Sequence, residues 1–442
     1  MSLSELKNKK LRNVAILTGL CFVGVWISYF FLGHHLISAA YEGKSLRLIN
    51  QIIAGQAKHP LTYYTQKADT LIKNFLIWGI STMGMIVVLL WVKEKIKAGT
   101  KKIALNLFVF GLAFMFSFLM AESLCRVMGF KPLAVTKNKI KVEPGGKLVA
   151  IHPTLGYIFL PGQFQVTLPS DYSFTITHTA DAHRATHPFA ANGIQNEKKE
   201  IWIFGCSFTY GWSLNDNETY PWLLQEELPN YEVVNFGTIG YGTLQPLIQF
   251  REALQKGKKP AAIVYAYASF HDERNTFLRK RRQAVGSANE LGSFRQPYAR
   301  FDKNGNLIYS MADVIYHEFP FARYSALIHL LEEKYNDLEE PFIHSHEVTK
   351  AIIKDFHTMA EQQGIEFVVA GIDSDSARTL NELHGEGIKT VDIAVDLSDQ
   401  KNRNWPYDSH PNAKANRVYA QKLEAFLNEQ VLKKPEMTNQ HG

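Results

Sequence analysis

The hydrophobic positions of this chain change pattern between its first and second halves. Three runs near the N-terminus are long, apolar and free of charged residues, at 14–32, 74–92 and 103–121. At about 1.5 Å of rise per residue, each run approaches the roughly 30 Å hydrocarbon core of a bilayer. The pattern predicts a membrane region over 1–130 with three transmembrane helices. A cleaved signal peptide for the first run, and buried globular helices for the other two, are the alternatives.

From residue 200 onward, short apolar runs typical of buried strands alternate with segments of helical period. The strand candidates are 201–204, 232–236, 261–267, 366–372 and 389–395, and the helix candidates are 220–228, 244–255, 324–335, 348–363 and 412–426. This alternation favours a parallel sheet covered by helices on both faces. We therefore predict an α/β fold, a three-layer sandwich with a parallel, flavodoxin-like sheet.

The remaining segments complete the predicted domain organisation. A basic stretch, 131–147, ends in Pro-Gly-Gly and is expected to be a linker, and 148–199 alternates in short patches that predict a β-rich accessory segment. The α/β domain is expected over 200–430, with an insertion at about 275–320 that contains a hairpin turn. A disordered tail is expected over 431–442.

Charge adds a prediction of topology. Lysines precede the first apolar run and separate the second from the third, which places those flanks in the cytoplasm and the α/β domain outside it. The net charge of +6 is modest for 442 residues, so nucleic acid is not an expected partner. Three cysteines give no disulfide framework. We expect a multi-pass protein of a bacterial inner membrane, with a cytoplasmic N-terminus and a periplasmic domain.

Candidate chemistry lies at the ends of two strand candidates. Ser207 follows the run 201–204 after Gly205, and a glycine lets the backbone turn sharply enough to expose a hydroxyl at the sheet edge. Serine is a weak nucleophile and needs a base. Asp408 and His410 supply a carboxylate and an imidazole two residues apart, so both can face Ser207 if the segment is extended. The three residues suggest an acyl-transfer triad.

Four short blocks, each at the end of an apolar run, resemble those of the SGNH or GDSL-type serine hydrolases. The blocks are Gly205-Cys206-Ser207-Phe208-Thr209-Tyr210-Gly211, Asn235-Phe236-Gly237-Thr238-Ile239-Gly240-Tyr241-Gly242, Ser269-Phe270-His271-Asp272-Glu273-Arg274-Asn275 and Asp408-Ser409-His410-Pro411. They occur in the family's order over roughly residues 200–427. The resemblance implies that Ser207 is the nucleophile, His410 its base and Asp408 the residue that orients His410.

The resemblance also implies an oxyanion hole built from the N–H of Ser207, the N–H of Gly240 and the side chain of His271. Histidine stands here where the family has asparagine, so we expect a more pH-sensitive donor than an amide. Asp396 and Asp399 are the alternative acids if Asp408 points away.

Several other motifs are weaker. Cys206 is interpreted as a packed small residue, and Arg184 as a brace between the accessory segment and the site. The histidines around residues 178–187 lack a tight ligand pattern, so no metal and no cofactor is predicted. His344-Ser345-His346 is expected to be a surface loop, and the basic run 279–282 either meets an anionic substrate or a lipid headgroup, or is a solvated turn.

These observations lead to one functional hypothesis with two alternatives. We expect a membrane-anchored serine esterase or acyl hydrolase that forms an acyl-enzyme on an extracytoplasmic acylated glycan or lipid. The alternatives are an O-acyltransferase that modifies a cell-envelope polysaccharide, and a catalytically inactive glycan-binding module. Expected partners are the acylated substrate, the membrane and cell-envelope assembly proteins.

Overall fold

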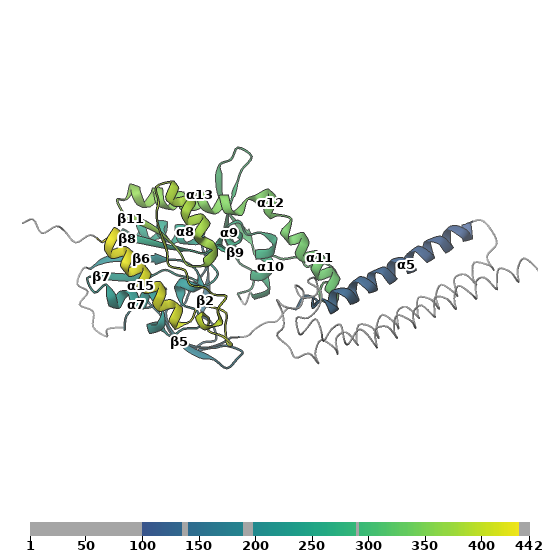
Figure 1. The fold of residues 1–442 in the computed structure, drawn as a ribbon, viewed down its shortest axis with the longest axis horizontal. Coiled ribbons are helices and arrows are strands. Elements are labelled where there is room, and N and C mark those ends of the chain that lie inside the picture. Colours follow the sequence, from purple (N-terminus) through teal and green to yellow (C-terminus); the bar gives the residue numbers. More distant parts are fainter. Residues whose placement is uncertain (1–99, 135–139, 189–197, 289–290, 433–442) are drawn as a thin grey trace, which may run out of the picture. The chain divides into compact units, whose positions relative to one another are not determined.

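The computed structural model describes residues 100–134, 140–188, 198–288 and 291–432 (Figure 1). Its internal contacts divide the chain into two compact units. The first unit comprises Met1–Ala134 with Glu318–Glu333, and the second comprises Val135–His317 with Lys334–Gly442. The candidate active site lies entirely in the second unit.

Helix α5 (Thr100–Val127) forms the described core of the first unit and contains the third apolar run. The first two runs, at 14–32 and 74–92, lie outside the described residues. Within the described part of the chain, no helix has both the length and the apolar character of a membrane span. At the end of α5, Glu122 forms an ion pair with Arg126 and accepts hydrogen bonds from the backbone N–H groups of Ala326 and Leu327. The Glu122 carboxylate thus caps the first turn of α11 (Ala326–Asp337).

The second unit is built on a five-stranded sheet in which every neighbouring pair is parallel. Its strands are β6 (Lys199–Phe204), β7 (Tyr231–Asn235), β8 (Ala262–Tyr267), β11 (Glu366–Gly371) and β12 (Lys389–Asp392). The spatial order β12-β11-β8-β6-β7 is the flavodoxin-like order 2-1-3-4-5 read from the other edge. All five strands fall on predicted apolar runs, and the α/β fold with a parallel sheet is confirmed.

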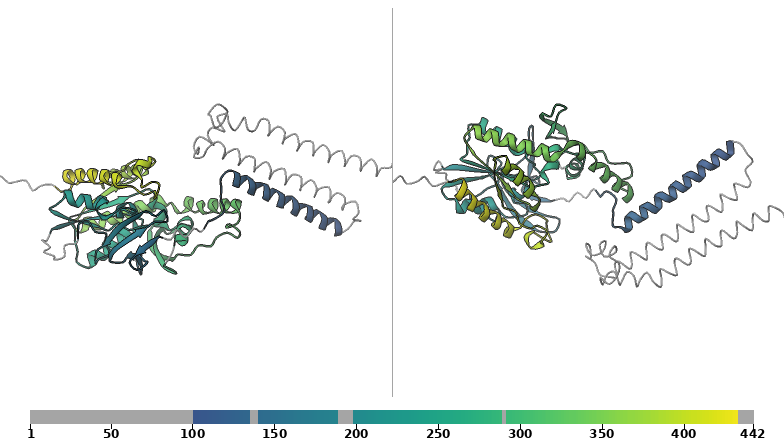
Figure 2. Two further views of the ribbon diagram at one scale, coloured as in Figure 1. Left: turned by 90° about the horizontal axis from the view of Figure 1, so that it is seen from below. Right: turned by 45° about the horizontal axis from the view of Figure 1, so that its top comes forward.

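Helices cover both faces of this sheet, as Figures 1 and 2 show. Alternate residues of β6 point to opposite faces, because successive side chains of a strand do so. Trp202 and Phe204 pack with α8, α13 and α14, whereas Ile201 and Ile203 pack with α7 and α15. These helices are α7 (Tyr220–Glu227), α8 (Leu244–Gln255), α13 (Ser345–Gln362), α14 (Ala377–Gly385) and α15 (Ala413–Gln430). The side chain of Asn412 caps α15.

The helix predictions were correct for α7, α8, α13 and α15, and the predicted helix 324–335 corresponds to α11. Five of the described helices were not predicted: α14, and the shorter α6 (Ser207–Tyr210), α9 (His271–Thr276), α10 (Arg279–Ala288) and α12 (Glu340–Ile343). The sequences of α9 and α10 are rich in charged and polar residues, so an apolar helical stripe hardly marks them.

Short antiparallel strands form the layer that precedes the sheet. They are β1 (Lys141–Glu143), β2 (Val149–His152), β3 (Gly156–Phe159), β4 (Gly162–Thr167) and β5 (Ser173–His178). β1 lies in the range expected to be a linker, where it pairs with β4. The insertion contains the hairpin of β9 (Arg295–Phe301) and β10 (Leu307–Asp313), which turns at Lys303-Asn304-Gly305-Asn306 as predicted.

Arg184 joins the accessory layer to the α/β domain, in agreement with its interpretation as a brace. Its backbone pairs with His178 at the end of β5 and with Asn235 at the end of β7. Its fully buried guanidinium donates to the carbonyl oxygens of Gly211 and Leu214, both at 2.6 Å, and forms an ion pair with Asp216 at 3.1 Å. A buried arginine with these partners fixes the segment that follows Ser207.

Candidate active site

The turn after β6 presents Ser207. Gly205 follows the strand, and a Cβ there would lie 2.1 Å from Thr209 Oγ1, so only glycine fits. Cys206 is fully buried, in agreement with its interpretation as a packed residue. Ser207 then opens the single-turn helix α6 (Ser207–Tyr210), with its side chain at the carboxyl edge of the sheet. Ligands of open α/β sheets bind at this edge.

His410 and Asp408 reach Ser207 from a loop 203 residues further along the chain. His410 Nε2 lies 3.0 Å from Ser207 Oγ, and His410 Nδ1 lies 2.5 Å from Asp408 Oδ1. The structure thus brings together the three residues that the sequence predicted for the triad. The alternative acids are engaged elsewhere, because Asp396 binds Ser398 and Asp399 caps a short 3-10 helix.

The loop geometry differs from the extended segment that we expected. Asp408 Oδ1 also accepts the backbone N–H of His410 at 2.7 Å, which folds the acid back onto the residue two positions later. Asn404 closes the loop by accepting from Asp408 N and donating to the carbonyl of His410, both at 2.9 Å. The carboxylate and the imidazole are therefore held together by a turn, which an isolated antiparallel bridge between Arg403 and Pro411 closes at its base.

The charge of Asp408 fixes the tautomer of His410. Burial acts to raise the pKa of Asp408, but hydrogen bonds from His410 and Trp212 outweigh it and lower the pKa below its ordinary value. An ionised carboxylate accepts the Nδ1–H of His410, which leaves the Nε2 lone pair directed at the serine hydroxyl. His410 can thus take the proton of Ser207.

Two backbone N–H groups are free to bind an oxyanion. Ser207 N opens α6, where a helix leaves its first donors unpaired, and Gly240 adopts a left-handed conformation with φ of +78°. Neither N–H donates a hydrogen bond within the described parts of the chain. Such donors stabilise the negative charge of a tetrahedral intermediate.

His271, the third predicted donor, is fully buried in the first turn of α9. Its Nδ1 accepts from the backbone N–H of Ala268 at 3.4 Å and lies 2.8 Å from the hydroxyl of Tyr265. Because Nδ1 is an acceptor, the neutral ring carries its proton on Nε2, and this buried atom has no hydrogen-bond partner among the described residues. An unpaired buried N–H is costly, which is consistent with a donor reserved for a bound oxyanion.

The electrostatics of His271 correct our expectation of a pH-sensitive donor. Burial, together with the charges of Arg274 and Arg281, lowers the pKa of His271 well below its ordinary value. The imidazole stays neutral through the physiological range. It therefore offers one fixed N–H, as an amide would.

Aromatic side chains border the serine hydroxyl. The ring of Phe208 packs edge-on against His410 at 5.6 Å and against Phe270 at 5.4 Å between centroids. The guanidinium of Arg274 covers Phe270 at 4.4 Å. Phe208 and Phe270 remain partly exposed, so they offer apolar surface to an acyl chain beside Ser207.

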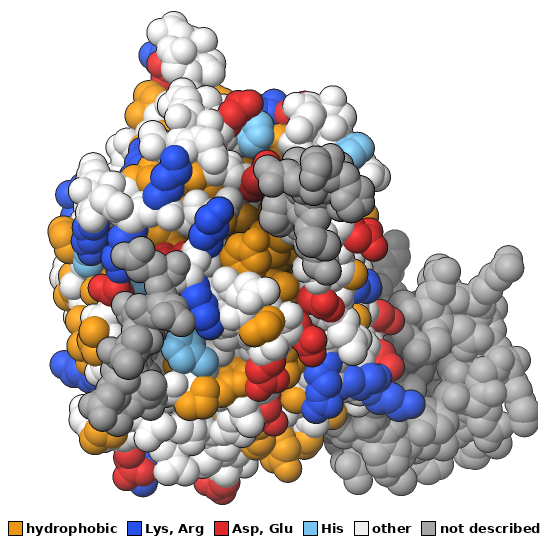
Figure 3. All heavy atoms as spheres, turned by 90° about the vertical axis from the view of Figure 1, so that its left-hand side faces the viewer, with side chains coloured by type: hydrophobic (Ala, Val, Ile, Leu, Met, Phe, Trp, Pro, Cys, Tyr) orange, Lys and Arg blue, Asp and Glu red, His pale blue; other side chains and the backbone are white. Residues whose placement is uncertain are grey.

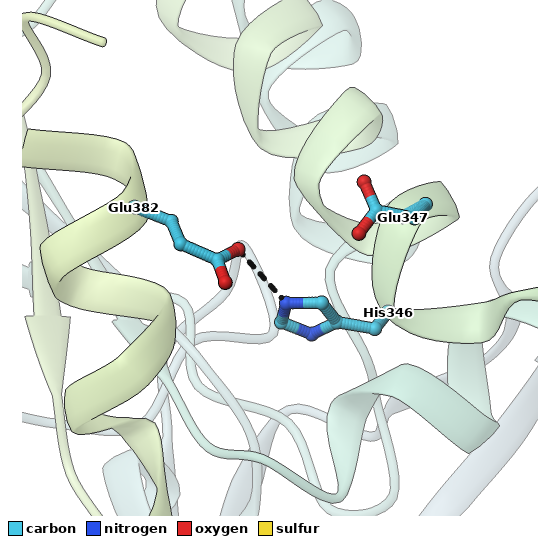
Figure 4. A group of neighbouring side chains, drawn as sticks. All are labelled: His346, Glu347 and Glu382. Atoms are coloured by element: carbon cyan, nitrogen blue, oxygen red, sulfur yellow. Dashed lines mark hydrogen bonds and ion pairs between the residues drawn. The ribbon is translucent and has the colours of Figure 1, made fainter. Parts of the chain in front are cut away.

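The expectation of a surface loop at 344–346 was wrong. Ser345 is fully buried at the start of α13, and His346 contacts Asp272 at 3.0 Å and Glu382 at 3.1 Å. Figure 4 shows His346 directed at Glu382, with Glu347 nearby. Within the described ranges these three form the single group with metal-ligand spacing. Lys350 Nζ lies 3.0 Å from Glu347 and 2.9 Å from Glu382, so a lysine cation already neutralises the acids.

The side chains of the basic run 279–282 mostly contact other residues of the protein. Arg279 stacks on Tyr316, Lys280 pairs with Glu273, and Arg282 pairs with Glu339. Arg281 instead donates to the carbonyl of Gly240. No pattern in the sequence predicts this contact, or the hydrogen bonds from Tyr157 and Arg274 to the same loop.

The chain was compared with known families, curated proteins and solved structures. No family model matches the chain, and no curated protein matches it. Several solved structures match over about half of the chain. They include a lipolytic protein of the G-D-S-L family from Veillonella parvula, with 14% identity, a TM-score of 0.30, and coverage of 52% of this chain and 99% of the other.

Two further matches have similar extents. A GDSL-like lipase from Bacteroides thetaiotaomicron has 14% identity, a TM-score of 0.28, and coverage of 53% of this chain and 91% of the other. A psychrotrophic esterase from Pseudoalteromonas sp. has 11% identity, a TM-score of 0.31, and coverage of 52% and 96%. What the candidate site can do is therefore inferred from its own geometry.

Proposed function

We propose that this chain is a serine esterase that cleaves acyl esters through an acyl-enzyme on Ser207. One observation carries the proposal: an unbroken hydrogen-bond chain from Ser207 Oγ through His410 to Asp408. The same observation favours an enzyme over a glycan-binding module, because binding alone needs no base held at 3.0 Å from an unmodified hydroxyl.

The reaction follows from the positions of these atoms. Ser207 Oγ attacks the ester carbonyl carbon while its proton passes to His410 Nε2, and Asp408 stabilises the resulting imidazolium. The carbonyl oxygen becomes an oxyanion that the N–H groups of Ser207 and Gly240 bind, with the Nε2–H of His271 as a third donor. Collapse breaks the ester C–O bond, and the leaving alkoxide takes the proton from His410.

The second half of the reaction regenerates the serine. His410 removes a proton from a water molecule, whose oxygen attacks the acyl-enzyme, and the carboxylic acid leaves as Ser207 Oγ regains its proton. A sugar hydroxyl in place of water would give the O-acyltransferase. We propose water as the acceptor, and an acylated glycan or lipid outside the cytoplasm as the substrate.

We also propose that the chain is anchored in a membrane with its α/β domain on the periplasmic side. Phe110 and Phe114 of α5 are exposed, which suits a lipid environment better than water.

On the face of the molecule drawn in Figure 3, the coloured basic and acidic side chains are interspersed with hydrophobic ones. This mixture offers no continuous basic surface of the kind that nucleic acids require on that face.

The test is labelling of membranes that contain the full chain with a fluorophosphonate probe, which phosphonylates activated serines. Labelling of the wild type that is lost in Ser207→Ala and His410→Ala would support the proposal. Release of free acid from a model ester, against transfer to an added sugar, would then distinguish esterase from transferase. A folded wild-type protein that does not label anywhere between about pH 6 and 9 would contradict the proposal.

A further inference from the structure

Three consecutive carbonyl groups around Gly240 each accept a hydrogen bond from a different side chain. The Tyr157 hydroxyl donates to the carbonyl of Ile239 at 2.5 Å, and Arg281 Nη2 donates to that of Gly240 at 2.6 Å. Arg274 Nη1 donates to the carbonyl of Tyr241 at 2.9 Å. Every carbonyl of the loop 239–241 is thereby fixed, while the N–H of Gly240 remains unpaired among the described residues.

The bond from Tyr157 acts on the peptide group that carries the oxyanion donor. The carbonyl of Ile239 and the N–H of Gly240 belong to one planar unit, so orienting the first orients the second. A hydrogen bond to the carbonyl also polarises the peptide and makes its N–H a stronger donor. Burial raises the pKa of Tyr157, which keeps its hydroxyl protonated and able to donate.

Tyr157 is itself held in place, and Arg281 keeps its charge. The Tyr241 hydroxyl donates to the carbonyl of Tyr157, so Tyr157 and the loop hold each other reciprocally. Burial lowers the pKa of Arg281 to about 10, which still leaves its guanidinium charged at neutral pH. The positive charges of Arg274 and Arg281 beside the loop favour the negative charge that develops on the bound oxyanion.

Gly240 itself fits this arrangement closely. A Cβ at this position would lie 2.6 Å from Tyr157 Oη and 3.2 Å from Arg281 Nη2, and its φ of +78° disfavours any side chain. The donors approach so closely because the residue between them has no side chain. Gly240 and the three donors therefore form one unit, which we call the carbonyl clamp.

We propose that Tyr157, Arg274 and Arg281 are positioning residues that hold the Gly240 N–H in the oxyanion hole. The inference rests on the proposed esterase function and adds a role for segments outside the sheet. Tyr157 comes from β3 of the accessory layer, Arg274 from α9 and Arg281 from α10 of the insertion. The accessory layer and the insertion thus complete the catalytic machinery from outside the strands that carry the triad.

The test compares Tyr157→Phe, which removes one hydroxyl, with Tyr419→Phe as a matched control. Tyr419 is fully buried and its hydroxyl has no partner in the described chain, so its removal breaks no hydrogen bond. For the full-length protein in membranes, we would measure the phosphonylation rate of Ser207, and kcat and KM for a short-chain nitrophenyl ester. Misplacing one oxyanion donor is expected to lower kcat and the phosphonylation rate by about 10-fold to 100-fold. KM should stay within about two-fold of the wild-type value, since the contacts that bind the substrate equally in the ground state and the transition state are unchanged.

Two further readouts separate positioning from a general structural role. The pH dependence of the residual rate in Tyr157→Phe should match that of the wild type, because the triad is untouched. Arg281→Lys should retain more activity than Arg281→Gln, since lysine keeps a charged donor, and this pair supplies the test if Tyr157→Phe does not fold.

The outcomes distinguish the two proposals. A folded wild type that does not label overturns the esterase and the clamp together. If the wild type labels, but Tyr157→Phe or Arg281→Gln reacts as fast as Tyr419→Phe, only the carbonyl clamp is overturned.

Discussion

His410 and His271 are two imidazoles at one sheet edge with opposite surroundings. The Nδ1 of His410 faces the Asp408 carboxylate, whereas the Nδ1 of His271 accepts a backbone N–H and its ring lies near Arg274 and Arg281. A carboxylate stabilises an imidazolium, and neighbouring guanidinium groups oppose it. If His410 transfers the proton and His271 donates to the oxyanion, as we propose, the charge beside each ring decides which of the two roles that ring takes.

The largest effect on activity is expected when the imidazole that we propose as the base is removed. We expect His410→Ala to lower kcat/KM by about 10⁴-fold to 10⁶-fold, because a triad without its base leaves only the oxyanion hole and binding. Hydrolysis of a nitrophenyl ester measures this loss. Retention of more than a tenth of the wild-type rate in a folded variant would contradict the role of His410.

Removing the charge that defines His410 is expected to cost less. Asp408→Asn should lower kcat by about 10⁴-fold, because an amide can donate to Nδ1 and so favour the wrong tautomer. Asp396→Asn is the control, since Asp396 binds Ser398 and lies outside the triad. Equal losses of kcat in the two variants would show that Asp408 is not the acid that orients His410.

Removal of the fixed donor should have an intermediate effect. We expect His271→Ala to lower kcat by about 100-fold to 1000-fold, the usual cost of one oxyanion donor. His271→Asn should recover most of this loss, because an amide also presents an N–H. If His271→Ala reacts as fast as the wild type, His271 fills space and binds no oxyanion.

The smallest expected effect is on the pH dependence of stability. His271 and His178 stay neutral in the fold, and burial lowers the pKa of His178 to about 4. Below about pH 6.5 the unfolded chain protonates both rings while the folded chain does not, so the free energy of unfolding falls as pH decreases. Each ring contributes up to about 1.4 kcal/mol per pH unit.

Chemical denaturation between about pH 6.5 and 4.5, the range in which these rings differ between the two states, measures that slope. The slope should be smaller in His271→Asn than in the wild type. The catalytic pH profile of His271→Asn should keep the wild-type shape. A changed profile would mean that His271 titrates during catalysis.

The sequence was sufficient for the parts of the site that depend on local signals. Ser207 follows an apolar run and a glycine, and Asp408 and His410 contact each other through a two-residue turn. The three central strands, β6, β8 and β11, are nearly continuous apolar runs, because both of their faces are covered by helices. These signals lie in neighbouring residues and could be read from the sequence, although we expected an extended segment at 408–410 where the structure forms a turn.

The clamp and the His346 contacts depend on residues far apart in the sequence. Tyr157 and Ile239 are 82 residues apart, and His346 and Asp272 are 74 residues apart. No periodicity connects such pairs, and tyrosine and arginine have ordinary surface or core roles at most positions. The neutral state of His271 also follows from burial and from Arg281, which only the folded chain brings near it.

The triad draws its nucleophile from the first strand of the sheet and its base from beyond the last, with 203 residues between Ser207 and His410. During synthesis, a chain that has emerged only as far as β11 carries the serine without any base to activate it. The proposed hydrolytic activity would then begin once β12 has joined the sheet and the loop 404–412 has folded before α15. Completion of the fold would in this sense be the activation step of the proposed esterase.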